Sequence, residues 1–143
     1  MTIALPQGIK LEQGPGGLER LTIDTPAAQG EVYLHGGHVT RWQPQGHQPV
    51  LWMSAKSQFA PDKPIRGGVP ICFPCFGRST DYPALPPHGL ARLMPWKLAA
   101  AAVLADGACT GLKSPQDDWN QAGAVTSVPG SKFWAARTIM VDI

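Results

Sequence analysis

The chain has 143 residues, of which 43% are hydrophobic, with 16 glycines, 15 prolines and a formal net charge of +2. This length fits one modest domain, the hydrophobic share excludes a disordered chain, and the small charge gives no reason to expect a nucleic-acid partner. We expect no membrane span and no signal peptide, and the odd number of cysteines fits a reducing compartment, so we predict a cytoplasmic protein.

Short strands are predicted in the first third of the chain. Residues 18–24, LERLTID, alternate apolar and polar side chains, and Pro26 ends that run. Residues 30–44 predict two strands, over 32–34 and 39–42, around a Gly-Gly turn. Residues 49–54, PVLWMS, form another short apolar run. Strands at such intervals favour a β-sandwich or barrel.

The middle of the chain is rich in proline and predicts loops. Residues 60–68, APDKPIRGG, and 79–87, STDYPALPP, are expected to be loops. Residues 68–74, GVPICFP, predict a buried extended segment, because its prolines exclude a helix and limit pairing. The alanine run in residues 96–105 favours a helix by propensity and a strand by its neighbours, and both alternatives stay open.

The pattern changes at residue 106. The segment 106–143 shows neither a strand nor a helix period, and its apolar residues are scattered. We therefore divide the chain into a β-sandwich part, residues 1–105, and an irregular tail, residues 106–143. The short TIMV run at 138–141 could be a strand, but it has no evident partner.

Three side chains are the main candidates for chemistry. Arg66 precedes two glycines and the apolar segment VPICFP, a setting in which a guanidinium can grip phosphate or carboxylate. His88 follows two prolines and could transfer protons near neutral pH, and Arg92 could hold an anionic substrate beside it. The alternatives are a surface arginine that caps a loop and a histidine that is hydrogen-bonded in a turn.

Metal and redox sites are less well supported by the spacing of histidine and cysteine. His35 and His38 flank the Gly-Gly turn without a third ligand, and His47 resembles a loop residue. Cys72 and Cys75 form a C-x-x-C pair, but no helix pattern follows. Cys109 alone does not complete a zinc site, so we favour small buried hydrophobic residues and expect neither metal nor cofactor.

Three segments together resemble a known family. They are LHGGHVTRWQP, VLWMSAKSQFAPDKPIRGGVPICFPCFG and LPPHGLARLMPW, in this order. They resemble the hexose-6-phosphate mutarotases, or glucose-6-phosphate 1-epimerases, of the galactose-mutarotase-like (aldose 1-epimerase) superfamily. The resemblance covers residues 30–105 and implies an all-β fold, the N-terminal portion of an antiparallel β-sandwich with an open cleft. It also implies interconversion of the α and β anomers of an aldohexose 6-phosphate without cofactor or metal.

The resemblance assigns roles to individual residues. Arg66 and Arg92 match arginines of the substrate and phosphate site, and His88 matches a histidine that lines the sugar cleft and could supply one proton transfer. The sequence departs from the family at Pro87 and Cys75. The family's second histidine and its glutamate base are also missing, because no histidine or glutamate follows His88.

These departures leave two functions open. The first is a truncated mutarotase that is weakly active or inactive. The second is a non-enzymatic remnant that binds a sugar phosphate or another anion. In either case the expected partner is a hexose 6-phosphate, with neither nucleic acid nor membrane, and the oligomeric state is not predicted.

Overall fold

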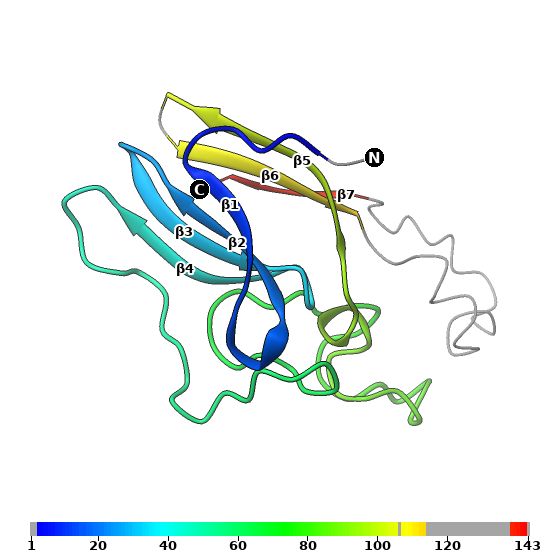
Figure 1. Ribbon diagram of the computed structural model, residues 1–143. Coiled ribbons are helices and arrows are strands. Elements are labelled where there is room, and N and C mark those ends of the chain that lie inside the picture. Colours follow the sequence, from blue (N-terminus) through cyan, green and yellow to red (C-terminus); the bar gives the residue numbers. More distant parts are fainter. Residues whose placement is uncertain (1–2, 106, 114–137, 143) are drawn as a thin grey trace.

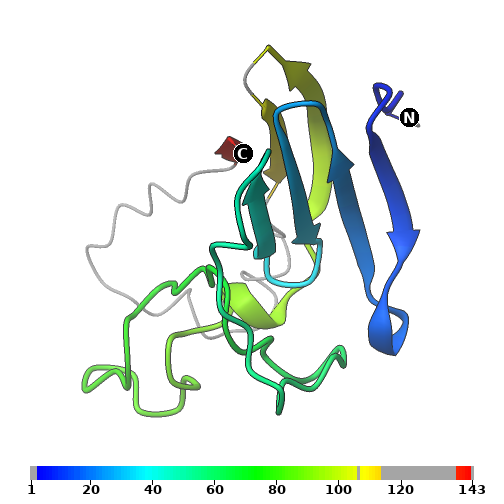
Figure 2. The same cartoon turned by 90° about the vertical axis from the view of Figure 1, so that its left-hand side faces the viewer.

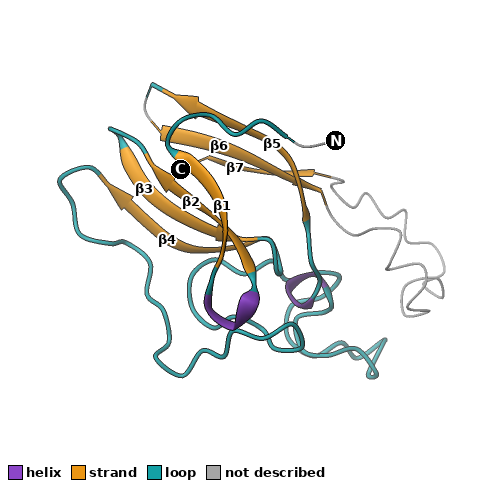
Figure 3. Ribbon diagram, viewed as in Figure 1, coloured by secondary structure: helices purple, strands orange, loops and turns teal. Residues whose placement is uncertain are grey.

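The computed structural model describes residues 3–105, 107–113 and 138–142, and almost all of its regular structure is β-strand. The strands form two antiparallel sheets, with the loops between β4 and β5 gathered beyond one end of them (Figure 1, Figure 3). This arrangement confirms the predicted all-β class. In the described part of the chain no helix is long and apolar enough to cross a membrane.

The first sheet has four strands in the order β1-β2-β3-β4, each antiparallel to the next. The predicted strands at 18–24, 32–34 and 39–42 are confirmed, although β3 begins earlier than expected. Alternation along the strands separates a buried face from a polar one, because successive side chains point to opposite faces. The strands are β1 (Ile9–Gln13), β2 (Glu19–Asp24), β3 (Ala28–Tyr33) and β4 (His38–Pro44).

The second sheet has three strands in the order β5-β6-β7: β5 (Lys97–Leu104), β6 (Gly107–Lys113) and β7 (Thr138–Asp142). The alanine run that left helix and strand open is the strand β5. It pairs with β6 from Lys97, opposite Lys113, to Leu104, opposite Gly107. The high helix propensity of alanine is therefore overridden by cross-strand pairing along the segment, because intrinsic propensity is weak relative to tertiary context.

The expectation of an irregular tail after residue 105 is wrong for two segments. β6 and β7 both lie in that tail, and the TIMV run finds its partner in β6, where Ile139 pairs with Leu112. Small residues fill β6, so its sequence carries little of the alternation that marks a strand. Residues 114–137, which make up most of the predicted tail, lie outside the described residues.

The core lies between the two sheets. Leu21, Ile23 and Val32 from the first sheet belong to the same buried cluster as Leu112 of β6 and Trp96, which precedes β5. Figure 2 shows the blue-to-teal strands of the first sheet in front of the yellow-green strands of the second. Burial of apolar surface from both sheets accounts for the packing of this sandwich.

We call residues 45–96, between β4 and β5, the loop region. Its regular structure is one short 3-10 helix, η2 (Ala91–Leu93), and isolated bridges such as Met53 with Gly67. The prediction that residues 68–74 are buried is wrong, because Val69 is 50% exposed and the segment from Ile71 to Cys75 is half-buried. Its prolines restrict it to single bridges, and its half-buried Ile71 and Phe73 pack against the core cluster from the end of the sandwich.

Candidate functional site

The Arg66-Gly67-Gly68 corner is held by backbone contacts that only glycine permits. Gly67 and Gly68 have φ values of +99° and +62°. A Cβ atom on Gly68 would lie 2.2 Å from the carbonyl oxygen of Val39 on β4. The Arg66 N–H donates to Ser57 Oγ at 3.0 Å, and its carbonyl accepts from the Ser54 N–H at 3.1 Å. The main chain of Arg66 is thus fixed, while its side chain is exposed.

His38, at the start of β4, lies directly beneath this corner. Its ring is fully buried, and its Nε2 atom lies 2.6 Å from the Gly67 carbonyl oxygen, to which it donates. Burial lowers the pKa of His38, against the opposing effect of the Gly67 carbonyl, and the charges of His35 and Arg92 lower it further. His38 is therefore neutral at physiological pH and serves as a support for the loop.

His35 has a similar supporting role. Its Nε2 atom lies 2.8 Å from the carbonyl oxygen of Lys63, so this histidine also joins the sheet end to the loop region. The two histidines that flank the Gly-Gly turn thus bond two different loop carbonyls. Among the described residues, no group of three histidine, cysteine or acidic side chains could hold a metal ion.

His88 has an unusual backbone and a defined ring orientation. Its φ is +69°, and its N–H donates to the Gly77 carbonyl at 2.7 Å. The Gly77 N–H in turn donates to Nδ1 of His88 at 3.0 Å. Because Nδ1 is an acceptor, the neutral ring carries its proton on Nε2. Phe76 packs edge-on against this ring, with 4.9 Å between ring centroids, and is itself 84% exposed. The site therefore presents a hydrogen-bond donor beside an aromatic surface.

Arg92, in η2, is tied to the segment that carries His88. One Nη atom donates to the Pro87 carbonyl at 2.7 Å, whereas Nε is buried with no partner among the described residues. Burial lowers the pKa of Arg92, the Cys72 thiol opposes this, and the positive charge of Arg66 lowers it further. The structure thus brings Arg92 within electrostatic reach of Arg66 and connects it to His88 through Pro87.

The two cysteines near these residues are free and half-buried. Cys75 Sγ lies 3.6 Å from the Gly77 carbonyl oxygen, and Cys72 lies within electrostatic reach of Arg92. No helix follows this pair before η2, so the setting of a thioredoxin-like redox site is absent from this stretch. The prediction that both thiols are buried is wrong, because the segment that carries them lies across the end of the sandwich.

Sequence reasoning missed a small pocket next to Arg66. It is lined by Lys56, Gln58, Lys63, Pro64 and Arg66. The available signal was three cations within eleven residues, K-x6-K-x2-R, with Ser57 inside this stretch and Ser54 just before it as acceptors for its backbone N–H groups.

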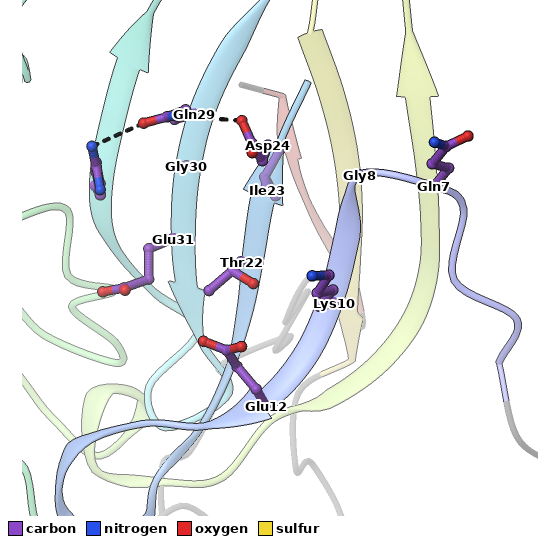
Figure 4. Close-up of a pocket in the computed structure, with 11 residues that line it drawn as sticks. Gln7, Gly8, Lys10, Glu12, Thr22, Ile23, Asp24, Gln29, Gly30 and Glu31 are labelled. Carbon is purple, nitrogen blue, oxygen red and sulfur yellow. Dashed lines mark hydrogen bonds between the residues drawn. The ribbon is translucent and has the colours of Figure 1, made fainter. Parts of the chain in front are cut away.

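A separate polar groove crosses the outer face of β1–β4 (Figure 4). Its polar side chains largely bond one another: Arg41 donates to Gln29 at 2.9 Å, and Gln29 donates to Asp24 at 3.3 Å. None of the three predicted site residues lines this groove. We therefore place the candidate site in the loop region.

Comparisons with known proteins show which family this chain resembles. The family model for aldose 1-epimerase matches residues 19–127. The chain is 40% identical over 90 residues to a protein of Escherichia coli (strain K12) named "Putative glucose-6-phosphate 1-epimerase", a match that covers 63% of this chain and 30% of that protein. It is 41% identical over 83 residues to a protein of the same name from Salmonella typhimurium, covering 58% and 28%. The chain thus spans about 30% of the length of these relatives.

Solved structures extend the likeness to the fold. The crystal structure described as a putative mutarotase, YeaD, from Salmonella typhimurium superimposes with a TM-score of 0.71 at 33% identity. That match covers 78% of this chain and 37% of that one. The structure of HI1317 gives a TM-score of 0.68 at 29% identity, over 78% and 40%.

Proposed function

This chain belongs to the aldose 1-epimerase family, and we propose that its substrate is an aldohexose 6-phosphate, with glucose 6-phosphate the first to test. The observation that carries the proposal is that Arg92 is bonded to the Pro87 carbonyl next to His88, whose Nε2–H is a donor, and lies within electrostatic reach of Arg66. A phosphate monoester supplies the anion that the arginines lack, and the sugar supplies oxygens for the imidazole.

The proposed reaction exchanges the two anomers through an open chain. A base takes the proton from the C1 hydroxyl while an acid protonates the ring oxygen, which breaks the C1–O5 bond and leaves an aldehyde. Rotation about the C1–C2 bond followed by reclosure gives the other anomer. In this scheme His88 donates a hydrogen bond from Nε2 to a sugar oxygen, because its Nδ1 is occupied by the Gly77 N–H.

The two arginines are proposed to bind the phosphate. Arg92 is held by the Pro87 carbonyl, its buried Nε has no hydrogen-bond partner among the described residues, and Arg66 repels it electrostatically. An anion between them would offset this repulsion and accept charge-assisted hydrogen bonds. A neutral sugar would not, so the arginines are expected to distinguish glucose 6-phosphate from glucose.

We propose that the 143-residue polypeptide by itself binds this substrate and turns it over weakly or not at all. No glutamate or histidine follows His88 in the sequence to act as its acid–base partner. The alternative function, a non-enzymatic module that binds sugar phosphates or other anions, rests on the same arginines. The free thiols of Cys72 and Cys75 are consistent with the cytoplasm as its compartment.

Binding of glucose 6-phosphate and glucose to Arg66→Ala and Arg92→Ala tests the substrate. We expect each variant to lose about tenfold or more in affinity for glucose 6-phosphate, because a hydrogen bond to a charged group contributes about 1.5–3 kcal/mol. The weak affinity for glucose should hardly change. Arg41→Ala, on the outer sheet face, is the matched control. Equal losses for both sugars would show that the arginines only support the fold.

Anomer exchange of glucose 6-phosphate, followed by NMR, separates the two functions. The quantity to measure is the exchange rate with the purified chain divided by the rate in buffer. A ratio near one together with specific binding supports the non-enzymatic module. A saturable acceleration that disappears in His88→Ala supports the enzyme and contradicts the proposal that this polypeptide turns substrate over weakly or not at all.

A further inference from the structure

Within the described part of the chain, β1 is an edge strand of the first sheet. It pairs with β2 on one side only, and Figure 2 shows it, in dark blue, as the outermost strand of that sheet. Of its five residues only Ile9 is buried, and Leu11 is 40% exposed. The N–H and carbonyl groups along such an edge can pair with a further strand.

The hydrogen bonds at the two ends of β1 show which of its residues face this edge. The Asp24 N–H donates to the Gly8 carbonyl at 2.7 Å, and the Gly14 N–H donates to the Leu18 carbonyl at 2.8 Å. Bonded and non-bonded positions alternate along an antiparallel pair, so the even-numbered residues of β1 bond β2. The backbone of Leu11, the central residue, therefore points its donor and its acceptor outward.

The charges on β1 favour one way of pairing this edge with a second copy of itself. An antiparallel pair in which outward-facing residues meet can be centred on residue 10, 11 or 12. Centring on Lys10 or Glu12 sets like charges directly opposite each other, which is unfavourable. Centring on Leu11 sets each Lys10 opposite Glu12 of the second copy, pairs all five residues of β1 and brings the two Leu11 side chains together.

Both charged side chains are available for such pairs. Lys10 forms no ion pair with any described residue, and Glu12 is 41% exposed while one of its oxygens contacts Nη2 of Arg20 at 3.0 Å. The second carboxylate oxygen can accept from a lysine. Figure 4 shows Lys10 and Glu12 on the same side of β1, where both line the outer groove. A lysine on an edge opposes strand addition, so this edge favours a strand that brings a carboxylate opposite Lys10.

We propose that two copies of this chain associate edge to edge through β1, antiparallel and centred on Leu11. The two four-stranded sheets then form one continuous sheet, and the same surface serves both copies. The two Leu11 residues exchange both backbone hydrogen bonds, and each Gln13 N–H donates to the Ile9 carbonyl of the second copy. The Ile9 N–H adds no bond, because it already donates to the Pro6 carbonyl at 3.1 Å. One short strand from each copy makes a small interface, so the dimer is weak and forms at high concentration.

Sedimentation equilibrium of the 143-residue polypeptide, from micromolar to millimolar concentration, tests the interface with two charge variants. Lys10→Glu turns both cross-strand pairs into two acidic pairs, and Glu12→Lys turns them into two basic pairs. We expect each variant alone to dimerise about tenfold or more weakly than the wild type, because like charges directly opposite are destabilising. An equimolar mixture of the two restores both opposite-charge pairs and should associate as the wild type does.

Two further variants separate charge from backbone pairing. Lys97→Glu makes the same charge change on β5, an edge strand of the second sheet, and should leave dimerisation unchanged. Leu11→Pro removes the outward N–H without removing a bond to β2, so it should abolish dimerisation. Circular dichroism establishes that each variant keeps the strand content of the wild type. In the wild type, the Leu11 N–H should become protected from hydrogen exchange only as the dimer forms.

Three results would overturn the proposal. The first is a wild type that stays monomeric at millimolar concentration. The second is protection of the Leu11 N–H in the monomer, which would mean that another part of the same chain covers the edge. The third is a dimer that the charge variants leave unchanged, which would use another surface. None of these measurements involves glucose 6-phosphate, so the proposed function is tested separately.

Discussion

In the two sheets, buried apolar side chains fix the structure, whereas the loop region adds backbone hydrogen bonds and positive-φ glycines to a few buried residues such as Ile65 and Trp96. Leu21 and Val32 are completely buried between the sheets. In the loop region, by contrast, Phe73 N–H bonds the carbonyl of His88, and Leu90 N–H bonds the carbonyl of Phe73. Large apolar side chains such as Trp52 and Phe76 are exposed there.

This difference means that the sheets mainly determine the stability of the fold and the loop region mainly determines the geometry of the candidate site. A buried sheet position accepts a substitution that keeps the apolar volume, because the stabilisation from the core depends on buried apolar surface area and on packing. A loop position such as Gly68 accepts almost none, because its φ is positive and a carbonyl lies against it. Variants in the sheets should therefore alter global unfolding, and variants in the loop region should alter ligand binding more than unfolding.

The largest effect on stability is expected for Leu21→Ala. This side chain is fully buried in the core cluster, and deletion of a buried leucine to alanine costs about 2–5 kcal/mol in the free energy of unfolding. Leu11→Ala, on the neighbouring strand at 40% exposure, is the control and should lose less than about half as much. Urea unfolding measures both, and similar losses at the two positions would break the comparison.

A loop glycine should have a smaller effect on unfolding but a larger one on binding. A Cβ atom on Gly89 would lie 2.0 Å from the Phe73 carbonyl oxygen, so Gly89→Ala must shift the segment that carries His88. We expect a loss of about 1–3 kcal/mol in unfolding free energy, from backbone strain, and loss of measurable glucose 6-phosphate binding.

Gly46→Ala is the matched control for Gly89→Ala. Gly46 also has a positive φ, +75°, but nothing lies within 4 Å of its added Cβ. It therefore isolates the conformational strain from the collision, and we expect binding to be retained. If Gly46→Ala abolished binding as well, the loop effect would be one of general destabilisation.

The junction between sheet and loop region should respond to acid. Burial lowers the pKa of His38 below its usual value of about 6.5, so in the window below pH 6.5 the unfolded chain binds a proton that the folded chain does not. The contribution of neutral His38 to stability is fully present above pH 6.5 and falls as the pH drops toward the lowered pKa. The slope is at most about 1.4 kcal/mol per pH unit for one proton.

Replacement of the ring isolates this effect. His38→Gln removes the titrating group. Below pH 6.5, the unfolding free energy of this variant should therefore depend less steeply on pH than that of the wild type. His47→Gln, in an exposed turn, should retain the wild-type slope. An unchanged slope in His38→Gln would show that another group titrates at the junction.

Sequence predicted β2, β3 and β4 of the first sheet but missed β1, in which only Ile9 is buried. Residues 18–24 alternate visibly because Leu21 and Ile23 face the core. β6 escaped prediction, and β7 was noted only as a possible strand without a partner, because the pairing of both is set by the three-dimensional arrangement and not by a local period. β5 was ambiguous since alanine satisfies both a helix and a half-buried strand.

The candidate site was predicted only in part. The motifs marked Arg66, His88 and Arg92, but they could not show that His38 supports Gly67 or that His35 holds the Lys63 carbonyl. These contacts join residues about 30 positions apart, 29 for His38 with Gly67 and 28 for His35 with Lys63. No local pattern encodes such a distance, so the two histidines were weighed as a metal pair and not as supports.

The smallest effect is expected on the polar outer face of the first sheet, with Glu12→Gln. Its carboxylate lies 3.0 Å from Nη2 of Arg20, which also pairs with the half-buried Glu31 at 2.6 Å, so Arg20 keeps a partner when Glu12 is neutralised. An exposed ion pair contributes about 0.2–1 kcal/mol and is screened by salt. Glu19→Gln removes an exposed carboxylate without an ion pair among the described residues and should change stability even less.

Urea unfolding of both variants at low and high salt measures the difference, which should shrink as salt is added. A loss in Glu12→Gln comparable to that of Leu21→Ala would mean that surface charges, and not the buried face, hold this sheet together, and the contrast between the sheets and the loop region would have to be drawn differently.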